Sequence, residues 1–149
     1  MEKLLLPGDF KEFLKLLNSH GVRYLLVGGY AVVFHGYVRS TGDMDIWVAT
    51  DAENAASLAA AVREFGFAGA EVTPSLFQEE GRTIRMGVPP VRLEIFTGLS
   101  GVDFDECYAE RNTMDIDGIP VSLISLRHLK ANKRAAGRLK DLADLESLP

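Results

Sequence analysis

Two aspartates separated by one residue are the clearest candidates for chemistry in this sequence. Asp43 and Asp45 stand at the start of an apolar stretch that ends at Val48. Side chains two positions apart on a strand point to the same side, so both carboxylates share one face if this stretch is a strand. Neighbouring carboxylates repel each other unless a cation lies between them. The pair is a candidate site for a divalent metal ion, with an ordinary charged strand face as the alternative.

A pair of glycines precedes the aspartates. Gly28 and Gly29 follow the apolar run 24–27, which has the pattern of a buried strand, and precede the short helix-compatible segment 30–35. Paired glycines let backbone N–H groups come close to a ligand, and the start of a helix adds partial positive charge. The turn could therefore hold phosphate oxygens, although a glycine pair alone usually marks only a turn.

The order of these features within one strand–helix–strand unit is more specific than any single one. It resembles the signature of the nucleotidyltransferase superfamily of the polymerase-beta type, above all its minimal single-domain members. Tyr30 replaces a serine found in some branches, which removes one hydroxyl from the phosphate cradle but leaves the metal site. The match falls on a glycine pair, a basic and hydroxyl pair and the D-x-D aspartates, namely Gly28, Gly29, Arg39, Thr41, Asp43 and Asp45.

The resemblance implies a third carboxylate on a strand beside the one that carries the D-x-D. The segment 91–96 alternates apolar and polar residues and supplies Glu94. Most relatives have aspartate there, so glutamate adds one methylene. The alternative interpretation of Glu94 is a salt bridge with Arg92 or Arg85.

A second part of the resemblance lies near the C-terminus. The segment 129–148, LKANKRAAGRLKDLADLESL, resembles the C-terminal signature of one bacterial branch of these minimal enzymes. By that resemblance Lys133 lies near the triphosphate and Asp141 closes the motif structurally. Neither Lys133 nor Arg39 has an obvious partner for a pair within a helix, so both are expected to serve the nucleotide. Further cations in this segment are expected to be surface charges, namely Lys130, Arg138 and Lys140.

Other residues have simpler interpretations. Trp47 shares the side of Asp43 and Asp45, so it either stacks on a base or packs in the core. His35 is expected to be structural, because no second histidine or cysteine stands at the spacing of a zinc site. Acids at the start of a helix usually cap it, which is the role expected for Asp103 and Asp105.

The elements that position these residues follow from periodicity and cap signals. Helices are expected over 9–21, capped by Asp9 with Glu12, after Thr50 with Glu53 in a capping box, over 102–111, after Ser125 and after Gly137. Strands are expected over 24–27, 43–48, about 70–73, 82–88 and 91–96, with a hairpin over 112–123 that turns at Asp117 and Gly118. The fold class expected is α/β (α+β), a nucleotidyltransferase fold with a mixed, twisted sheet flanked by helices.

Composition fits one small domain that spans residues 1–149. The chain has 47% hydrophobic residues and a formal net charge of −5, which disfavours extended nucleic-acid binding. The single cysteine, Cys107, excludes an internal disulfide and indicates a reducing compartment. The apolar run within residues 1–10 is too short for a signal peptide. No later stretch approaches the ~20 apolar residues that span a membrane. We expect a cytoplasmic protein.

The function expected is transfer of a nucleoside monophosphate from an NTP to a hydroxyl acceptor, with release of pyrophosphate. Mg²⁺ or Mn²⁺ would be held by Asp43, Asp45 and Glu94. The acceptor stays open between a protein hydroxyl, on a partner encoded nearby for example, an RNA end and a small antibiotic-like alcohol. The alternative is a non-catalytic or regulatory partner-binding protein, such as the antitoxin-like member of a two-gene pair. A dinucleotide-binding oxidoreductase is disfavoured because GGYAVV lacks the G-x-G-x-x-G spacing.

Overall fold

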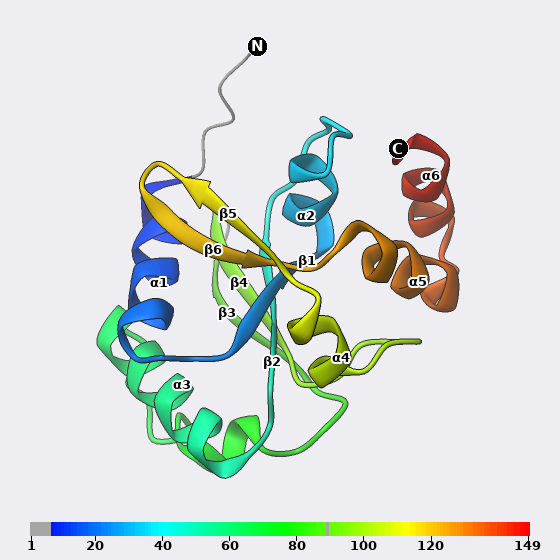
Figure 1. Ribbon diagram of the computed structural model, residues 1–149. Coiled ribbons are helices and arrows are strands. Elements are labelled where there is room, and N and C mark those ends of the chain that lie inside the picture. The colour runs from blue at the N-terminus through cyan, green and yellow to red at the C-terminus, as the bar shows by residue number, and fades with distance from the viewer. Residues whose placement is uncertain (1–6, 89) are drawn as a thin grey trace.

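The computed structural model describes residues 7–88 and 90–149 (Figure 1). Pro89, which stands between the strands expected over 82–88 and 91–96, lies outside the described residues, as do the opening residues 1–6. The helices are α1 (Gly8–Ser19), α2 (Gly28–Phe34), α3 (Ala52–Phe65), the 3₁₀ helix η1 (Pro74–Phe77), α4 (Phe104–Ala109), α5 (Leu126–Ala136) and α6 (Leu139–Ser147). The strands are β1 (Tyr24–Val27), β2 (Met44–Val48), β3 (Thr83–Val88), β4 (Val91–Phe96), β5 (Asn112–Ile116) and β6 (Ile119–Leu123).

The strands form one mixed sheet with the order β3-β4-β2-β1-β6-β5. Strand β2 is antiparallel to β1 and parallel to β4, and β1 is parallel to β6. Hairpins β3–β4 and β5–β6 add the two outer strands. The mixed sheet flanked by helices that the sequence predicts is confirmed.

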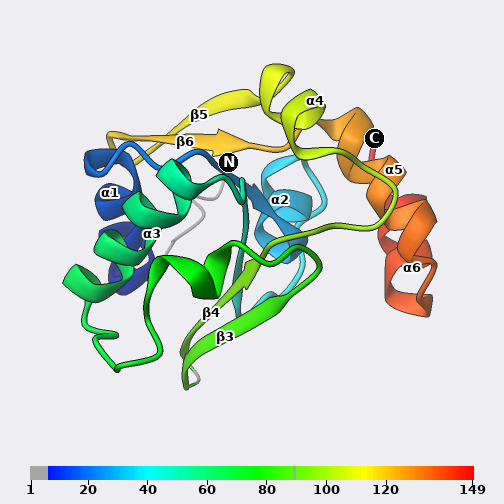
Figure 2. The ribbon, with the colours of Figure 1, turned by 90° about the horizontal axis from the view of Figure 1, so that it is seen from below.

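The two faces of the sheet have different roles. Tyr24 of β1 is paired with Val48 of β2, and its hydroxyl donates a hydrogen bond to Asn18 of α1 over 3.2 Å. This face, with the buried Ile46, is therefore covered by α1, and α3 packs against α1 (Figure 2). The opposite face carries Asp45, because alternate residues of a strand point to opposite sides.

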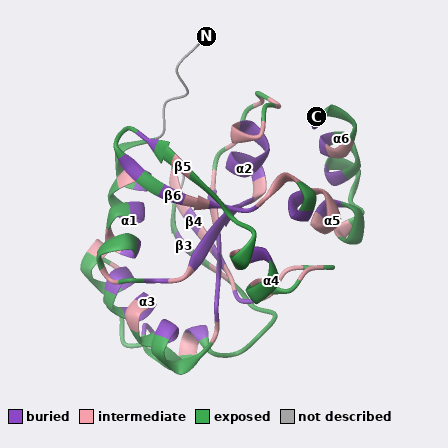
Figure 3. Cartoon of the chain, viewed as in Figure 1, coloured by how far each residue is buried: buried purple, intermediate pink, exposed green. Residues whose placement is uncertain are grey.

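Burial follows this division. In Figure 3 the central strands and the inward sides of α1 and α3 are buried, while the outward sides of these helices are exposed. Helices α5 and α6 lie at the other end of the molecule from α1 and α3 (Figures 1 and 2). Within the part of the chain that the structure describes, no helix has the length and apolarity needed to cross a membrane.

Four expectations about local structure are wrong. Asp105 lies in the first turn of α4 and does not cap it, since Asp103 is the N-cap. Pro7 occupies the N-cap of α1 and no side chain caps it, so Asp9 lies inside the first turn. Asp51, not Thr50, caps α3, and its carboxylate accepts a hydrogen bond from the Asn54 backbone N–H over 3.1 Å. The segment 70–73 forms a turn instead of a strand, because only one of its apolar side chains, that of Val72, is buried.

Other local predictions are confirmed. The hairpin turns at Asp117 and Gly118, which both have positive φ, 52° and 85°, as a two-residue type I′ turn requires. The side chains of Ser125 and Asp103 cap α5 and α4 by accepting hydrogen bonds from backbone N–H groups three residues later.

Candidate active site

The register of the sheet brings the predicted carboxylates together. Parallel pairing of β2 with β4 sets Asp45 directly opposite Glu94. Asp43 immediately precedes β2 and lies on the side of Asp45 by strand alternation. Glu94 is thus on the neighbouring strand, where the resemblance places the third carboxylate.

Two of the three carboxylates are paired with arginines. Asp43 Oδ2 accepts hydrogen bonds from Arg92 Nε at 3.0 Å and from Nη2 at 2.7 Å, and these bonds hold the pKa of Asp43 below its ordinary value. Glu94 Oε1 accepts a hydrogen bond from Arg85 Nε at 3.0 Å. The salt-bridge interpretation of Glu94 therefore describes a contact that exists, and a role in metal binding stays a prediction.

Asp45 differs from both. Its Oδ1 is inaccessible to solvent and accepts no hydrogen bond. Among the described residues, no other side-chain oxygen or nitrogen is buried in this way without a partner. Burial, reinforced by the charges of Glu94 and Asp43, raises the pKa of Asp45 to about 7. A buried carboxylate without a donor is costly in its ionised form. An added cation should therefore stabilise the folded protein most when it binds beside Asp45, since Asp43 and Glu94 already have arginine partners.

The glycine turn packs directly onto this strand. Gly28 has φ of +65°, and a Cβ there would lie 2.0 Å from Asp45 Oδ2. A Cβ on Gly29 would lie 2.1 Å from Thr41 Oγ1. Both positions need glycine because a neighbouring side chain occupies the space, and Gly28 also needs it for its backbone conformation.

Two adjoining cavities border the carboxylates. The first, about 460 Å³, is lined by Thr41, Asp43, Asp45 and Glu94 among others. The second, about 390 Å³, includes the glycine turn and Lys133 in its lining. The residues common to both are Gly29, Arg39, Asp45 and Lys140. Every site residue predicted from the sequence lines one of these two cavities, namely Gly28, Gly29, Arg39, Thr41, Asp43, Asp45, Glu94 and Lys133.

The cations expected to serve the nucleotide already have partners. The Lys133 side chain is 7% exposed, and its Nζ lies 3.1 Å from Asp141 Oδ1 and 3.1 Å from Asp144 Oδ2. Arg39 donates to both oxygens of Asp144, at 2.9 and 3.1 Å. These partners come from another element, since α6 folds back on α5 and presents two acids to Lys133 and Arg39. The lack of a partner within a helix therefore does not leave either cation free.

Asp141 has the structural role expected of it. Its carboxylate forms the capping box of α6 with Arg138 and accepts from Arg138 Nε at 2.7 Å. Burial would raise the pKa of Asp141, but the hydrogen bonds from Arg138 and Lys133 outweigh it, and the pKa lies below the ordinary value. Arg138 is exposed, as expected of a surface charge, and it is paired with Asp141.

Two clusters of charge thus border the same cavities. We call the first the strand cluster, and its members are Asp43, Asp45, Glu94, Arg85 and Arg92. We call the second the helix cluster, and its members are Lys133, Asp141, Asp144, Arg39 and Arg138.

Comparison with known proteins assigns the chain to a family. The family model for aminoglycoside-2''-adenylyltransferase matches residues 9–144, which is nearly the whole chain. The chain belongs to this family. It is accordingly a nucleotidyltransferase, as the order of the glycine pair, Arg39, Thr41 and the D-x-D predicts. A search of curated proteins finds no match.

Two solved structures share the fold. TM1012 from Thermotoga maritima, assigned as a nucleotidyltransferase, is 16% identical with a TM-score of 0.64, over 97% of this chain and 94% of the other. ANT(2'')-Ia, solved in complex with adenylyl-2''-tobramycin, is also 16% identical with a TM-score of 0.52, over 92% of this chain and 83% of the other. At this identity the likeness supports the nucleotidyltransferase fold alone.

Sequence reasoning missed two residues that hold members of the site, and it assigned His35 correctly to a structural role. Arg92 and Asp144 were not predicted as site residues, yet they hold Asp43 and Arg39 respectively. The signal for Asp144 was its spacing of three from Asp141, which puts both on one face of α6. His35 is structural as expected, since its Nε2 lies 2.6 Å from the carbonyl oxygen of Ile124.

The donor chemistry of the strand cluster fits a divalent cation. As they stand, no three Asp, Glu, His or Cys side chains among the described residues converge on one position for an ion. Asp43 and Glu94 are engaged by arginines, so an ion would have to replace those contacts. Carboxylate oxygens are the ligands that Mg²⁺ and Mn²⁺ prefer, and Asp45 Oδ1 is the buried oxygen that lacks a partner.

Proposed function

We propose that this protein transfers a nucleoside monophosphate from an NTP to the hydroxyl group of a small-molecule acceptor, in a reaction that depends on Mg²⁺ or Mn²⁺. The observation that carries the metal dependence is the sealed, unpartnered Oδ1 of Asp45, with Asp43 and Glu94 on the same face. A cytoplasmic setting, in which nucleotides and Mg²⁺ are available, accords with the single unpaired Cys107.

Each predicted residue has a part in this reaction. Asp43, Asp45 and Glu94 would hold the metal, which supplies charge neutralisation at the phosphates and a lower pKa for the acceptor hydroxyl. The backbone at Gly28 and Gly29 can come close to the phosphates because neither glycine has a Cβ. Cations around the glycine turn stabilise the charge that develops on the leaving pyrophosphate. They are Arg39, Lys133 and Lys140.

Thr41 has a positioning part. Its Oγ1 fills the space that a Cβ of Gly29 would take, so it fixes the loop before β2 against the glycine turn. This contact keeps Asp43 and Asp45 in register with the turn. Arg85 and Arg92 would move off the carboxylates when the metal binds, because a divalent ion replaces the charge they now neutralise.

The comparisons support a small molecule as the acceptor. The family is named for aminoglycoside adenylylation, and ANT(2'')-Ia carries an adenylylated tobramycin. These findings favour an aminoglycoside-like alcohol as acceptor and ATP as donor over a protein hydroxyl or an RNA end. The formal charge of −5 also suits a cationic small molecule better than an RNA.

Label transfer tests the proposal. The protein is incubated with each of the four α-labelled NTPs, Mg²⁺ or Mn²⁺, and tobramycin, a protein lysate or an RNA, with Asp43→Asn as the inactive control. We expect labelled tobramycin and pyrophosphate with the wild type, and neither with Asp43→Asn. Label in protein or RNA alone would overturn the acceptor class. No product with any donor, metal or acceptor would overturn the enzyme proposal in favour of the partner-binding alternative.

A further inference from the structure

Helix α6 has the reverse of the usual burial pattern. The residues that it buries are two acids of the helix cluster, Asp141 and Asp144. Its leucines lie elsewhere, since Leu139 is 88% exposed and Leu142 is 46% exposed. A helix on the surface of a folded protein normally buries its apolar stripe. Helix α6 is therefore held in place through its charges, while apolar side chains face the solvent.

These leucines form the main exposed apolar surface of a helix in the protein. Four large apolar side chains are exposed among the described residues, and two of them stand one turn apart on α6. The four are Val38, Val88, Leu139 and Leu142. Helix α6 forms an edge of the molecule in two perpendicular views, so another molecule can reach it (Figures 1 and 2). Neighbouring exposed apolar side chains mark interaction surfaces more often than isolated ones do.

The residues around Leu142 match themselves in an antiparallel pair. An α-helix turns about 100° per residue, so Leu139 and Leu145 lie about 60° to either side of Leu142. Arg138 and Glu146 lie about 40° to either side of it. When two copies of α6 pair antiparallel about a two-fold axis at Leu142, each residue is level with the residue of the partner equally far beyond that axis. Leu139 is then level with the partner's Leu145. Arg138 is level with the partner's Glu146.

The charged residues of this face are available to pair across the two-fold axis. Arg138 binds Asp141 through Nε and Nη2, and its side chain is 62% exposed, so Nη1 stays open to another acid. Glu146 is exposed, and no residue that the structure describes forms an ion pair with it. Opposite charges at the two ends of one row of leucines favour antiparallel pairing and oppose parallel pairing, in which like charges would meet. This charge complementarity indicates a second copy of the chain as the occupant.

We propose that α6 is a dimerisation helix, which pairs antiparallel with α6 of a second copy about a two-fold axis at Leu142. Lys140, which lines both cavities beside the carboxylates, lies about 160° around the helix from Leu142, so the cavities stay open in the dimer. One pair of short helices buries less than the ~1,600 Å² of a standard interface, so the dimer dissociates on dilution. The proposal does not depend on the transfer reaction.

Sedimentation of the full chain from low micromolar to millimolar concentration tests this dimer. The wild type should shift from 16.3 kDa to twice that mass as the concentration rises. Leu142→Glu should stay a monomer throughout, because it places like charges together at the axis. Val88→Glu changes an apolar side chain of β3 that is 75% exposed, and this matched control should associate as the wild type does. A monomeric wild type at every concentration, or a dimer that persists in Leu142→Glu, would overturn the proposal.

Cross-linking tests the position of the axis. In Leu142→Cys the two introduced thiols meet at the axis, within the range in which a disulfide can form. The native Cys107 is completely buried and does not compete. Mild oxidation should therefore yield a covalent dimer of Leu142→Cys and little of the control Val88→Cys. Equal yields from the two variants would show random collision and contradict the interface.

A reversed charge tests the antiparallel order. Glu146→Lys places like charges beside Arg138 at both ends of the interface and should weaken dimerisation about threefold to tenfold. Glu12→Lys reverses an exposed acid on α1 and should leave the dimer unchanged. Equal dimerisation of the two variants would overturn the antiparallel order.

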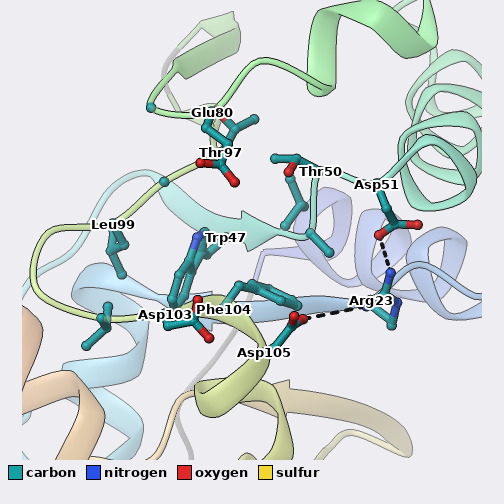
Figure 4. Close-up of a pocket in the computed structure, with 15 residues that line it drawn as sticks. Arg23, Trp47, Thr50, Asp51, Glu80, Thr97, Leu99, Asp103, Phe104 and Asp105 are labelled. Carbon is teal, nitrogen blue, oxygen red and sulfur yellow. Dashed lines mark hydrogen bonds and ion pairs between the residues drawn. The ribbon is translucent and has the colours of Figure 1, made fainter.

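Trp47 reports whether these variants are folded. It is the only tryptophan, is 2% exposed and packs edge-on against Phe104, with ring centroids 5.1 Å apart. It lies in the wall of the cavity shown in Figure 4, which no residue of α6 lines. Its emission should be the same in the wild type and in every α6 variant. If the emission of Leu142→Glu shows a loss of fold, cross-linking of Leu142→Cys decides the proposal alone.

Discussion

The strand cluster and the helix cluster border the same cavities but differ in how their charges are satisfied. The strand cluster has three carboxylates and two guanidinium groups, and it leaves one buried oxygen, Asp45 Oδ1, without a partner. The helix cluster has two carboxylates and three cations, with all its members joined by hydrogen bonds or ion pairs. The strand cluster therefore has one more carboxylate than it has cations, whereas every member of the helix cluster is paired.

This difference separates stability from function. A satisfied buried cluster strongly penalises the loss of one member, because the remaining charges stay buried without a partner. A cluster that is short of a cation is strained without its ligand and is stabilised when the ligand binds. Lys133 therefore has a structural role in addition to any contact with nucleotide, and ionised Asp45 has a cost that a bound cation would reduce.

Breaking the helix cluster should give the largest effect. Lys133→Ala leaves Asp141 and Asp144 buried with fewer partners, so it should lower the free energy of unfolding by about 3–5 kcal/mol. Thermal unfolding measures the effect, and Arg134→Ala, an exposed cation one residue later in α5, is the control. Equal melting temperatures of the two variants would contradict the structural role.

Removing the strain of the strand cluster should stabilise the metal-free protein in a pH-dependent way. Asp45 ionises near 3.8 when unfolded and near 7 when folded, so the folded state retains its proton between these values. The contribution to the free energy of unfolding is intact below about pH 4 and is lost as pH rises to about 7, by up to roughly 4 kcal/mol.

Asp45→Asn should abolish this part of the pH dependence. In EDTA, urea unfolding at pH 5 and pH 8 should show a smaller fall for the variant than for the wild type. At pH 8 the variant should be the more stable of the two. The same fall in both proteins would show that Asp45 ionises normally in the folded protein, and it would contradict the inferred strain of the strand cluster.

Two glycines test the close approach of the turn to Asp45. Gly28 and Gly21 have nearly the same φ, +65° and +67°, but a Cβ meets Asp45 at the first and nothing at the second. Gly21→Ala should lose about 1 kcal/mol from backbone strain. Gly28→Ala should lose about 1–3 kcal/mol more from the steric clash. Denaturant unfolding compares them, and equal losses would mean that Asp45 moves aside freely.

The smallest expected effect on stability comes from Glu94. Its partner Arg85 is 65% exposed, so Glu94→Gln should change the free energy of unfolding by less than about 1 kcal/mol. Turnover and Mn²⁺ affinity by calorimetric titration should nevertheless be lost. Glu110→Gln breaks a comparable exposed pair with Arg127, far from the carboxylates, and should leave Mn²⁺ binding intact. Unchanged Mn²⁺ affinity in Glu94→Gln would show that Glu94 forms the salt bridge with Arg85 and does not bind the metal.

The strand–turn–strand unit was predictable because its information is local. Residue spacing alone places Gly28 and Gly29 at the end of β1 and Asp43 and Asp45 on one side of β2. The role of Glu94 could be predicted only from the family resemblance. Alternation along 91–96 shows which side of its strand Glu94 faces, but not which strand lies beside it. The pairing of Arg92 with Asp43 depends on the parallel register of β2 and β4, which no pattern within one strand contains.

The helix cluster was missed for a different reason. The acids that hold Lys133 follow it by 8 and 11 residues, beyond the reach of pairs within one helix. They meet it because Gly137 takes a left-handed conformation, φ +63°, and turns α6 back on α5. The sequence shows that glycine as a helix end but does not show the angle between the two helices.

The measurement that tests the account most directly is a metal-dependent thermal shift with nucleotide. Wild type and Asp45→Asn are heated with each of four NTPs at millimolar concentration, with and without Mg²⁺ or Mn²⁺. The wild type should gain stability with at least one NTP only when metal is present, by about 2–3 kcal/mol at a hundredfold excess over the dissociation constant. Asp45→Asn should stay folded and show no such gain. A wild type whose stability with every NTP is the same with and without metal would contradict the central claim.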